Sequence, residues 1–219
     1  LDVVSREGER YVSLDDLGVA LPQYPFKEHR AKYVREKRAS YGGEEIDQTK
    51  TAEFKRWFGD WEKDPKKASK VVDESGKPLV VYHGTINDFD TFNPQMQYTL
   101  KGFFFSDKPE DATRWAEGKG ANIMPTYLTL KNPKRIDVKG EMFDFNKVKS
   151  KIVQAKNDGA DGVIIENVRN FPDSKPGNSI VVFEPTQIKS ATGNRGTFSP
   201  ESANILEEER MGYGRKAKI

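Results

Sequence analysis

The sequence predicts an α+β fold, in which short strands are interrupted by few helices in an uneven order. Five short runs of apolar or β-branched residues, each bounded by turn residues, indicate strands between residues 79 and 183. Two segments with helical periodicity separate some of these runs, and a third helical segment precedes them. A doubly wound sheet would need a helix between successive strands, so the uneven order favours the α+β class.

Residues 1–48 form a polar N-terminal appendage, to which the sequence assigns no function. A short strand is expected at Glu9–Ser13, followed by a basic helical stretch from Phe26 to Ala39. Its basic residues are interpreted first as a solvated helix face, with an acidic partner or a nucleic acid as the alternative.

A helical lead-in follows in residues 49–72, where Thr49 or Thr51 can cap the helix and Gly59 limits its length. Aromatic residues recur in this segment at three- and four-residue spacing. This pattern favours docking of the helix on a core over binding of a ligand, and it comprises Phe54, Trp57, Phe58 and Trp61.

Strands and two helices alternate unevenly through the rest of the chain. The first helix is expected to follow Asp107 as its cap, with Pro109 in its first turn, and to run to about Trp115. The second is expected from about Asn146 to Asn157, with Val148, Ile152 and Ala155 on one face, before a stop at Gly159. The expected strands are Leu79–Tyr82, Gly102–Phe105, Met124–Leu130, Gly162–Ile165 and Ile180–Phe183.

The composition is that of a soluble protein, because 35% of the 219 residues are hydrophobic and 32% are charged. No apolar run approaches the roughly 20 residues that a membrane helix needs, so no membrane partner is expected. A net charge of +2 is not typical of a dedicated nucleic-acid binder, and the absence of cysteine excludes disulfides, zinc–thiolate sites and thiol nucleophiles. The chain starts at Leu1 without a signal-like stretch, so we expect a piece of a longer protein that ends in a flexible tail at 206–219.

His83 is the first candidate for chemistry, because it ends an apolar run and is followed at once by Gly84 and Thr85. A polar residue at the exit of a strand, beside a glycine, lies where a ligand can approach the backbone closely. A satisfied structural histidine is the alternative, and the residues alone leave both interpretations open. The other histidine, His29, lies in a charged stretch, so His83 has no second ligand and a metal site is not expected.

The aromatic residues Phe104 and Trp115 form a second candidate site. In the expected strand Phe104 faces the side opposite to its two phenylalanine neighbours, and Trp115 ends the helix that follows. A strand–helix unit can return both rings to one place, where they would clamp a flat ring; packing in the core is the alternative.

A third candidate lies at Asn178 and Ser179, at the mouth of a strand that begins after a Pro-Gly turn. These two residues can meet His83 only if their strands are neighbours, which the spacing does not show.

Together these segments resemble the ADP-ribosyltransferase superfamily. Tyr82-His83-Gly84-Thr85 is similar to the first motif of diphtheria-toxin-like transferases and poly-ADP-ribose polymerases, and the segment from Lys101 to Trp115 is similar to the second. The lead-in, the segment around His83 and the closing segment from Gln187 to Phe198 are most similar to the ADP-ribosyltransferase domains of phage and mobile-element polyvalent proteins. This resemblance defines a domain at residues 49–205.

The resemblance implies a split, two-sheet antiparallel β-sandwich core with flanking helices, and NAD as a co-substrate without a metal. It implies that His83 binds a ribose and that the backbone of Gly84, followed by Thr85, pairs with the nicotinamide carboxamide. It also implies that Phe104 and Trp115 flank the nicotinamide ring. Stacking and backbone amides would then hold the ring without any charge.

The catalytic glutamate of the family is missing from this sequence. The matching position falls on Ser179, with Asn178 beside it, and neither residue carries a negative charge. Loss of one preorganised electrostatic contact costs on the order of 10²–10³ in rate. Three interpretations stay open: Ser179 or Asn178 performs a weaker version of the role, Glu166 reaches the site from the end of its strand, or the domain has no transferase activity.

The predicted function is an NAD-dependent mono-ADP-ribosyltransferase of toxin or effector type, which transfers ADP-ribose to a protein or nucleic-acid acceptor. The alternatives are a catalytically weak or inactive NAD-binding or interaction module, an RNA 2′-phosphotransferase and a phage-type nuclease. An immunity or inhibitor protein is an expected partner of a toxin. The parent is expected to be a larger phage, mobile-element or injected effector protein that acts in the cytoplasm of a target cell.

Overall fold

The computed structural model describes residues 47–87, 89–94, 102–116, 122–194 and 196–206. The expected strand at Glu9–Ser13 and the expected basic helix from Phe26 to Ala39 lie outside these residues, as does nearly all of the expected tail. Within the described ranges, no helix has the length and apolar character needed to cross a membrane.

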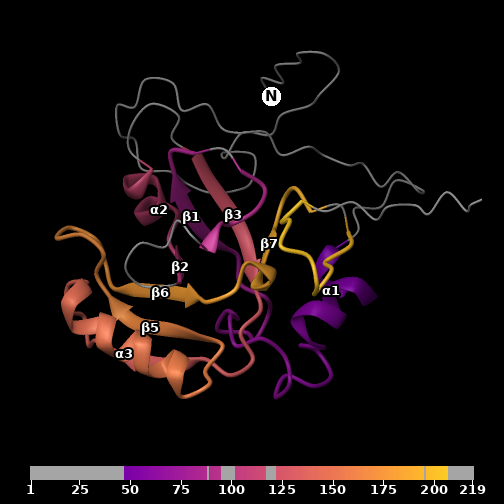
Figure 1. Cartoon of the computed structure of the whole chain (residues 1–219), viewed down its shortest axis with the longest axis horizontal. Coiled ribbons are helices and arrows are strands. Elements are labelled where there is room, and N and C mark those ends of the chain that lie inside the picture. Colours follow the sequence, from indigo (N-terminus) through magenta and orange to yellow (C-terminus); the bar gives the residue numbers. More distant parts are fainter. Residues whose placement is uncertain (1–46, 88, 95–101, 117–121, 195, 207–219) are drawn as a thin grey trace, which may run out of the picture.

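Seven strands form one sheet, in the spatial order β4-β5-β6-β2-β1-β3-β7 (Figure 1). Neighbouring strands are antiparallel except β4 and β5, which run parallel. The expected division of the core into two sheets is therefore not confirmed, because hydrogen bonds join all seven strands in a mixed α/β structure. The strands are β1 (Val81–Thr85), β2 (Phe103–Ser106), β3 (Asn122–Leu128), β4 (Lys134–Asp137), β5 (Gly162–Val168), β6 (Gly177–Val182) and β7 (Ile188–Ser190).

Three helices accompany the sheet in the part of the chain that the structure describes. α3 (Phe145–Asn157) lies along β5, α2 (Pro109–Trp115) lies beside β1, and α1 (Ala52–Phe58) lies near β7 (Figure 1). Two short 3-10 helices, η2 (Gln48–Lys50) and η4 (Pro185–Gln187), precede α1 and β7.

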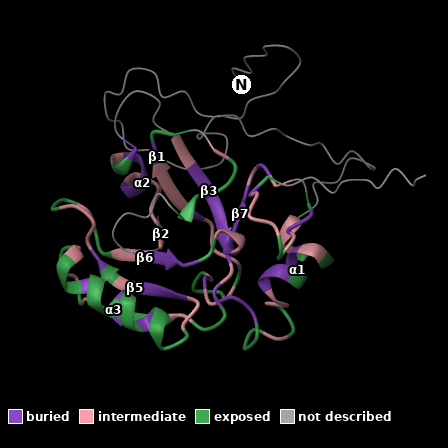
Figure 2. Cartoon of the chain, viewed as in Figure 1, coloured by how far each residue is buried: buried purple, intermediate pink, exposed green. Residues whose placement is uncertain are grey.

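The predicted helix α3 is confirmed, together with the face that it buries. The side chain of Asp144 caps α3 by accepting two backbone N–H groups. Its outer face is exposed (Figure 2), whereas the residues predicted to share one apolar face are buried: Val148, Ile152 and Ala155. The helix ends at Asn157, and Gly159, with a φ of 81°, supplies the stop.

Two of the strands, β4 and β7, have no counterpart among the predicted ones. In β4 only Ile136 is buried, so the segment lacks the apolar run that indicates a strand. Its extended conformation is stabilised by parallel pairing with β5, which a local pattern does not contain. β7 has three residues, and the middle one is a fully buried lysine, Lys189.

The predicted cap of α2 is wrong. The N-cap position is occupied by Lys108, which makes no side-chain cap bond, and Asp107 lies one residue earlier. Asp107 instead extends the β2 pairing, because its backbone N–H donates to the carbonyl of Asn178 at 3.1 Å. The Oγ of Ser106 accepts the N–H of Lys108 at 3.1 Å, so a residue before Asp107 satisfies the helix end.

Helix α1 docks on the sheet through its aromatic residues, as predicted. Thr51, and not Thr49, caps it by accepting the N–H of Phe54 at 3.2 Å. The fully buried members of the aromatic cluster on this helix are Phe54, Trp57 and Phe58, and Trp61 packs against them. Tyr127 of β3 and Phe198 complete the cluster from the other side.

The closing segment of the domain fastens β7 through buried polar side chains. Gln187 accepts the backbone N–H groups of Phe183 and Glu184 at 2.9 and 2.8 Å. Lys189 donates through Nζ to the carbonyls of Ser202 and Asn204 at 2.7 and 3.2 Å. The polar residues of this segment therefore serve the fold, and the candidate site must be sought elsewhere.

Candidate functional site at the β1–β2 ladder and helix α2

His83 lies at the end of the β1–β2 ladder. The two strands share one registered pair, Tyr82 with Ser106. One residue further along β1, the Nδ1 of His83 contacts the carbonyl oxygen of Phe104 at 2.8 Å. A side chain thus joins the two strands where the backbone pairing stops.

The contact with Phe104 fixes the protonation of the histidine ring. A carbonyl oxygen only accepts, so Nδ1 carries the proton and Nε2 is the acceptor of the neutral ring. Burial lowers the pKa of His83, although the hydrogen bond to Phe104 opposes this, and the neutral form is favoured at neutral pH. The rings of Phe92 and Phe105 pack at centroid distances of 5.0 and 5.4 Å. The geometry suits a structural histidine and also one that presents Nε2 to a hydroxyl group.

Gly84 brings strand β1 into direct contact with the backbone of α2. A Cβ at this position would lie 1.9 Å from the carbonyl oxygen of Ala112. The glycine is therefore required by the helix, independently of any ligand. The neighbouring Thr85 is buried, and its Oγ1 accepts the N–H of Asn87 at 3.1 Å.

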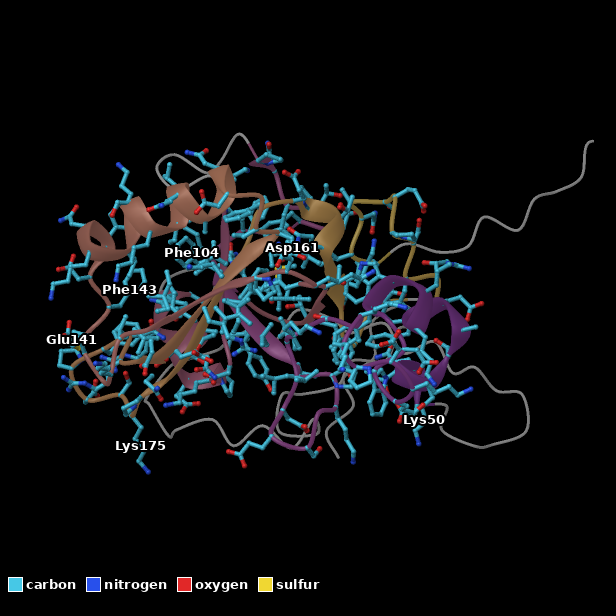
Figure 3. All side chains as sticks on the ribbon, turned by 90° about the horizontal axis from the view of Figure 1, so that it is seen from below. Lys50, Phe104, Glu141, Phe143, Asp161 and Lys175 are labelled. Carbon is cyan, nitrogen blue, oxygen red and sulfur yellow. The ribbon has the colours of Figure 1, made fainter. Side chains whose placement is uncertain are left out.

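Phe104 and Trp115 lie apart, each against another ring. Phe104 packs edge-on against Phe143 at a centroid distance of 6.1 Å (Figure 3), and Trp115 lies 6.1 Å from Phe171. Trp115 is 37% exposed. No ring contact joins Phe104 to Trp115 within the described ranges, so the predicted clamp is not closed in this structure.

Ser179 lies on β6, opposite Ser106 of β2. Because β2 lies between β6 and β1, Ser179 and His83 are on strands that are not neighbours. The Oγ of Ser179 is buried and donates to the Oδ1 of Asn170 at 3.0 Å. Asn178 contributes its backbone carbonyl to the N–H of Asp107.

The structure does not bring Glu166 to these residues. Glu166 forms an ion pair with Arg135 of β4. Since side chains alternate along a strand, Glu166 faces away from the side of the sheet that its neighbour Ile165 shares with α3.

A buried polar cluster beside Ser179 was not predicted, and its centre is Asp111 of α2. Asp111 is 1% exposed, and its Oδ2 accepts from the Nδ2 of Asn170 at 2.7 Å and from the Oγ of Ser106 at 3.3 Å. Burial raises the pKa of Asp111 and that of Asp107. An aspartate in the first turn of a helix is usually explained by a favourable interaction with the helix dipole. The sequence alone therefore gives no reason to expect a buried cluster at Asp111.

Metal binding finds no support in the described part of the chain, where no group of three or more His, Cys, Asp or Glu side chains could hold an ion. The chemistry available at the β1–β2–α2 junction is a neutral imidazole, aromatic rings and buried carboxyls.

Comparison with known proteins identifies the family. The mixed seven-stranded sheet with three helices is compatible with an ADP-ribosyltransferase fold. A family model described as ADP-ribosyltransferase in polyvalent proteins matches residues 73–198, and the chain belongs to this family. Membership supports a transferase enzyme in general, and enzymes of this family use NAD as a substrate. No curated protein matches the chain.

Proposed function

We propose that this domain binds NAD beside His83 and transfers its ADP-ribose group to a protein or nucleic-acid acceptor. The observation that carries the proposal is the protonation state of His83, because the contact of Nδ1 with Phe104 leaves Nε2 as an acceptor. A ribose hydroxyl donates to such a nitrogen, and a neutral ring does not repel the cationic nicotinamide. The lowered pKa of His83 supports the same assignment.

The face of the sheet that α2 covers, next to the strand that carries His83, supports binding of a flat ring. Trp115 keeps an accessible face at the end of α2, and Gly84 places the backbone of β1 next to the same helix. Phe104 is two residues before Ser106, which bonds to Asp111 of α2, so its side chain points to the face that α2 covers. An aromatic ring that stacks on a nucleotide base contributes about 1–3 kcal/mol. The proposed acceptor is a macromolecule of a target cell, as for a toxin or effector.

A second candidate is a module that retains the fold and lacks transfer activity. Its support is Ser179, which the family resemblance places at the position of the catalytic glutamate, and whose hydroxyl donates to Asn170. A serine that already donates to an asparagine cannot supply the missing negative charge.

The test is mass spectrometry of the chain incubated with NAD, with and without a cell lysate. We expect nicotinamide release and ADP-ribose on a macromolecule, and loss of both in His83→Ala and Trp115→Ala. Ile86→Ala is the matched control, since Ile86 follows β1 and is 55% exposed. Full activity in both site variants would refute the site. NAD that is bound in calorimetry and left intact would establish a module that binds NAD without transfer, and absence of NAD binding would refute the first candidate.

A further inference from the structure

Helix α3 has a charge pattern that the fold does not explain. It carries four lysines and no acidic residue over 13 residues, and acidic residues stand only at its caps, Asp144 and Asp158. The first turn contains a lysine and no acidic residue, although the positive end of the helix dipole disfavours a cation there. The four lysines are Lys147, Lys149, Lys151 and Lys156.

These lysines are available to an external anion. Lys149 and Lys151 are exposed and form no ion pair with any described residue. The other two lysines form ion pairs in contact with solvent, which contribute little to stability and can be exchanged for contacts with another anion. These pairs are Lys147 with Glu141 at 3.2 Å and Lys156 with Glu184 at 3.9 Å (Glu141 is labelled in Figure 3).

The lysines form two rows, one on each flank of the helix. Lys147 and Lys151 are four residues apart and share one flank, whereas Lys149 and Lys156 are seven residues apart and share the other. The Nζ of Lys156 lies 5.0 Å from the ring of Phe183, just after β6, so its row faces that strand. A helix with its side chains is about 10–12 Å across, and the two rows are separated by about this distance.

Strand β4 adds a cation to the row of Lys147 and Lys151. β4 and β6 lie on opposite sides of β5, so this row faces β4. Lys134 of β4 is exposed, and because side chains alternate along a strand it points to the same face as Ile136, which packs against the buried side of α3.

The exposed crown of α3 between the two rows is neutral and mostly polar (Figure 2). Val153 is its one large apolar residue, so the helix presents no apolar stripe to a bilayer and no apolar centre to a protein partner. Amide and hydroxyl groups hydrogen-bond to phosphates and to the edges of base pairs. The polar residues of the crown are Asn146, Ser150, Gln154 and Asn157.

We propose that α3 is a docking element for double-stranded DNA and lies in the major groove. That groove is about 12 Å wide and admits a helix, so the two rows meet the phosphates of the two strands while the crown faces the base pairs. Along the axis the lysines cover about 14 Å, which corresponds to about four base-pair steps. This activity goes beyond the proposed function and requires no NAD.

The same features favour a DNA duplex over other nucleic acids. The crown has no aromatic ring, on which unpaired bases of a single strand would stack. The major groove of an RNA duplex is deep and narrow, and side chains cannot read it.

The test is fluorescence anisotropy of a labelled 20-base-pair DNA duplex, titrated with the whole chain at several salt concentrations. The site variant replaces Lys149 and Lys151 by glutamine, which keeps the helix propensity close to that of lysine. The matched control replaces Lys63 and Lys66 by glutamine. These two lysines are also exposed, form no ion pair with a described residue and change the net charge equally. Thermal unfolding by circular dichroism verifies that both variants fold.

We expect the unmodified chain and the control to bind the duplex with a Kd of about 1–100 µM near physiological salt. In the site variant the affinity falls by on the order of tenfold, and the slope of log K against log salt concentration becomes shallower by about 1.8, for two lost phosphate contacts. No binding of the duplex at low salt overturns the proposal, as does an equal loss in the control variant. Tighter binding of a 20-base-pair RNA duplex or of phosphatidylserine vesicles would also overturn it.

Discussion

Replacing Gly84 by alanine tests the contact between β1 and α2, on which the candidate site depends. The added Cβ would lie 1.9 Å from the carbonyl oxygen of Ala112, 2.8 Å from its carbonyl carbon and 3.2 Å from its Cα. All three atoms belong to the backbone, so no side-chain rotation relieves the overlap. Helix α2 must move away from the strand.

The size of the movement follows from the same distances. To bring the carbonyl oxygen only to 3.0 Å, the helix must retreat by about 1.1 Å. Overpacking of this kind costs about 1–3 kcal/mol, and for a domain of this size about 2 kcal/mol lowers Tm by roughly 4–8 °C. Because α2 carries Asp111 and Trp115, the displacement also moves both side chains relative to His83. A misplacement of about 1 Å can cost on the order of 10²-fold in activity.

Thermal unfolding by circular dichroism and calorimetry with NAD measure the two effects of Gly84→Ala. Ile86→Ala serves as the control on the exposed side of the same segment and is expected to leave both quantities unchanged. A Gly84→Ala protein with unchanged Tm and unchanged affinity for NAD would show that α2 does not depend on this contact, and the reasoning would fail.

Three further substitutions address other parts of the structure. The pKa of His83 is lowered in the folded state, so the unfolded state binds more protons and stability falls as the pH drops through about 6.5. Between pH 8 and pH 5 the Tm of the unmodified chain should therefore fall further than that of His83→Gln, and parallel curves would contradict this. Lys189→Met leaves two backbone carbonyls without this donor and should lower the free energy of unfolding in urea by about 1–3 kcal/mol; no loss of stability would mean that the contacts are dispensable. Ser179→Glu should lower Tm and not raise nicotinamide release, because the position is 1% exposed and its partner Asn170 also binds Asp111; a gain in release would favour the inactive-module candidate.

The spacing of apolar residues along the sequence predicts the helices, because a helix is formed by residues close together in the chain. The apolar face of α3 could be predicted because the spacing of Val148, Ile152 and Ala155 matches one side of a helix. The aromatic docking of α1 could be predicted for the same reason. Strand β4 could not be predicted, because its single buried residue gives no apolar pattern and its partner β5 follows α3 in the chain.

The candidate site was predicted only where its residues are adjacent in the sequence. His83 and Gly84 stand next to each other in the sequence and signal a special position at a strand end. Asp111 gives no such signal, because its contact with Asn170 joins residues 59 apart. Its proximity to Ser179 depends on the pairing of β2 with β6, which the sequence left open.

The docking of α1 has a consequence for how the domain can be combined with others. The family match begins at residue 73, whereas the cluster that α1 forms with Tyr127 and Phe198 begins at Phe54. A fragment that begins at residue 73 lacks α1 and would leave Tyr127 and Phe198 uncovered. The folded unit is therefore larger than the matched region. The rings of Phe54 and Phe198 lie 5.0 Å apart, which places the incoming and outgoing stretches of chain side by side. Adjacent ends allow a domain to be inserted into a longer polypeptide as a self-contained unit. This contact lies at the β3–β7 edge of the sheet, two strands away from the central β6–β2 pair, so a connection made there leaves the β1–β2–α2 junction uncovered.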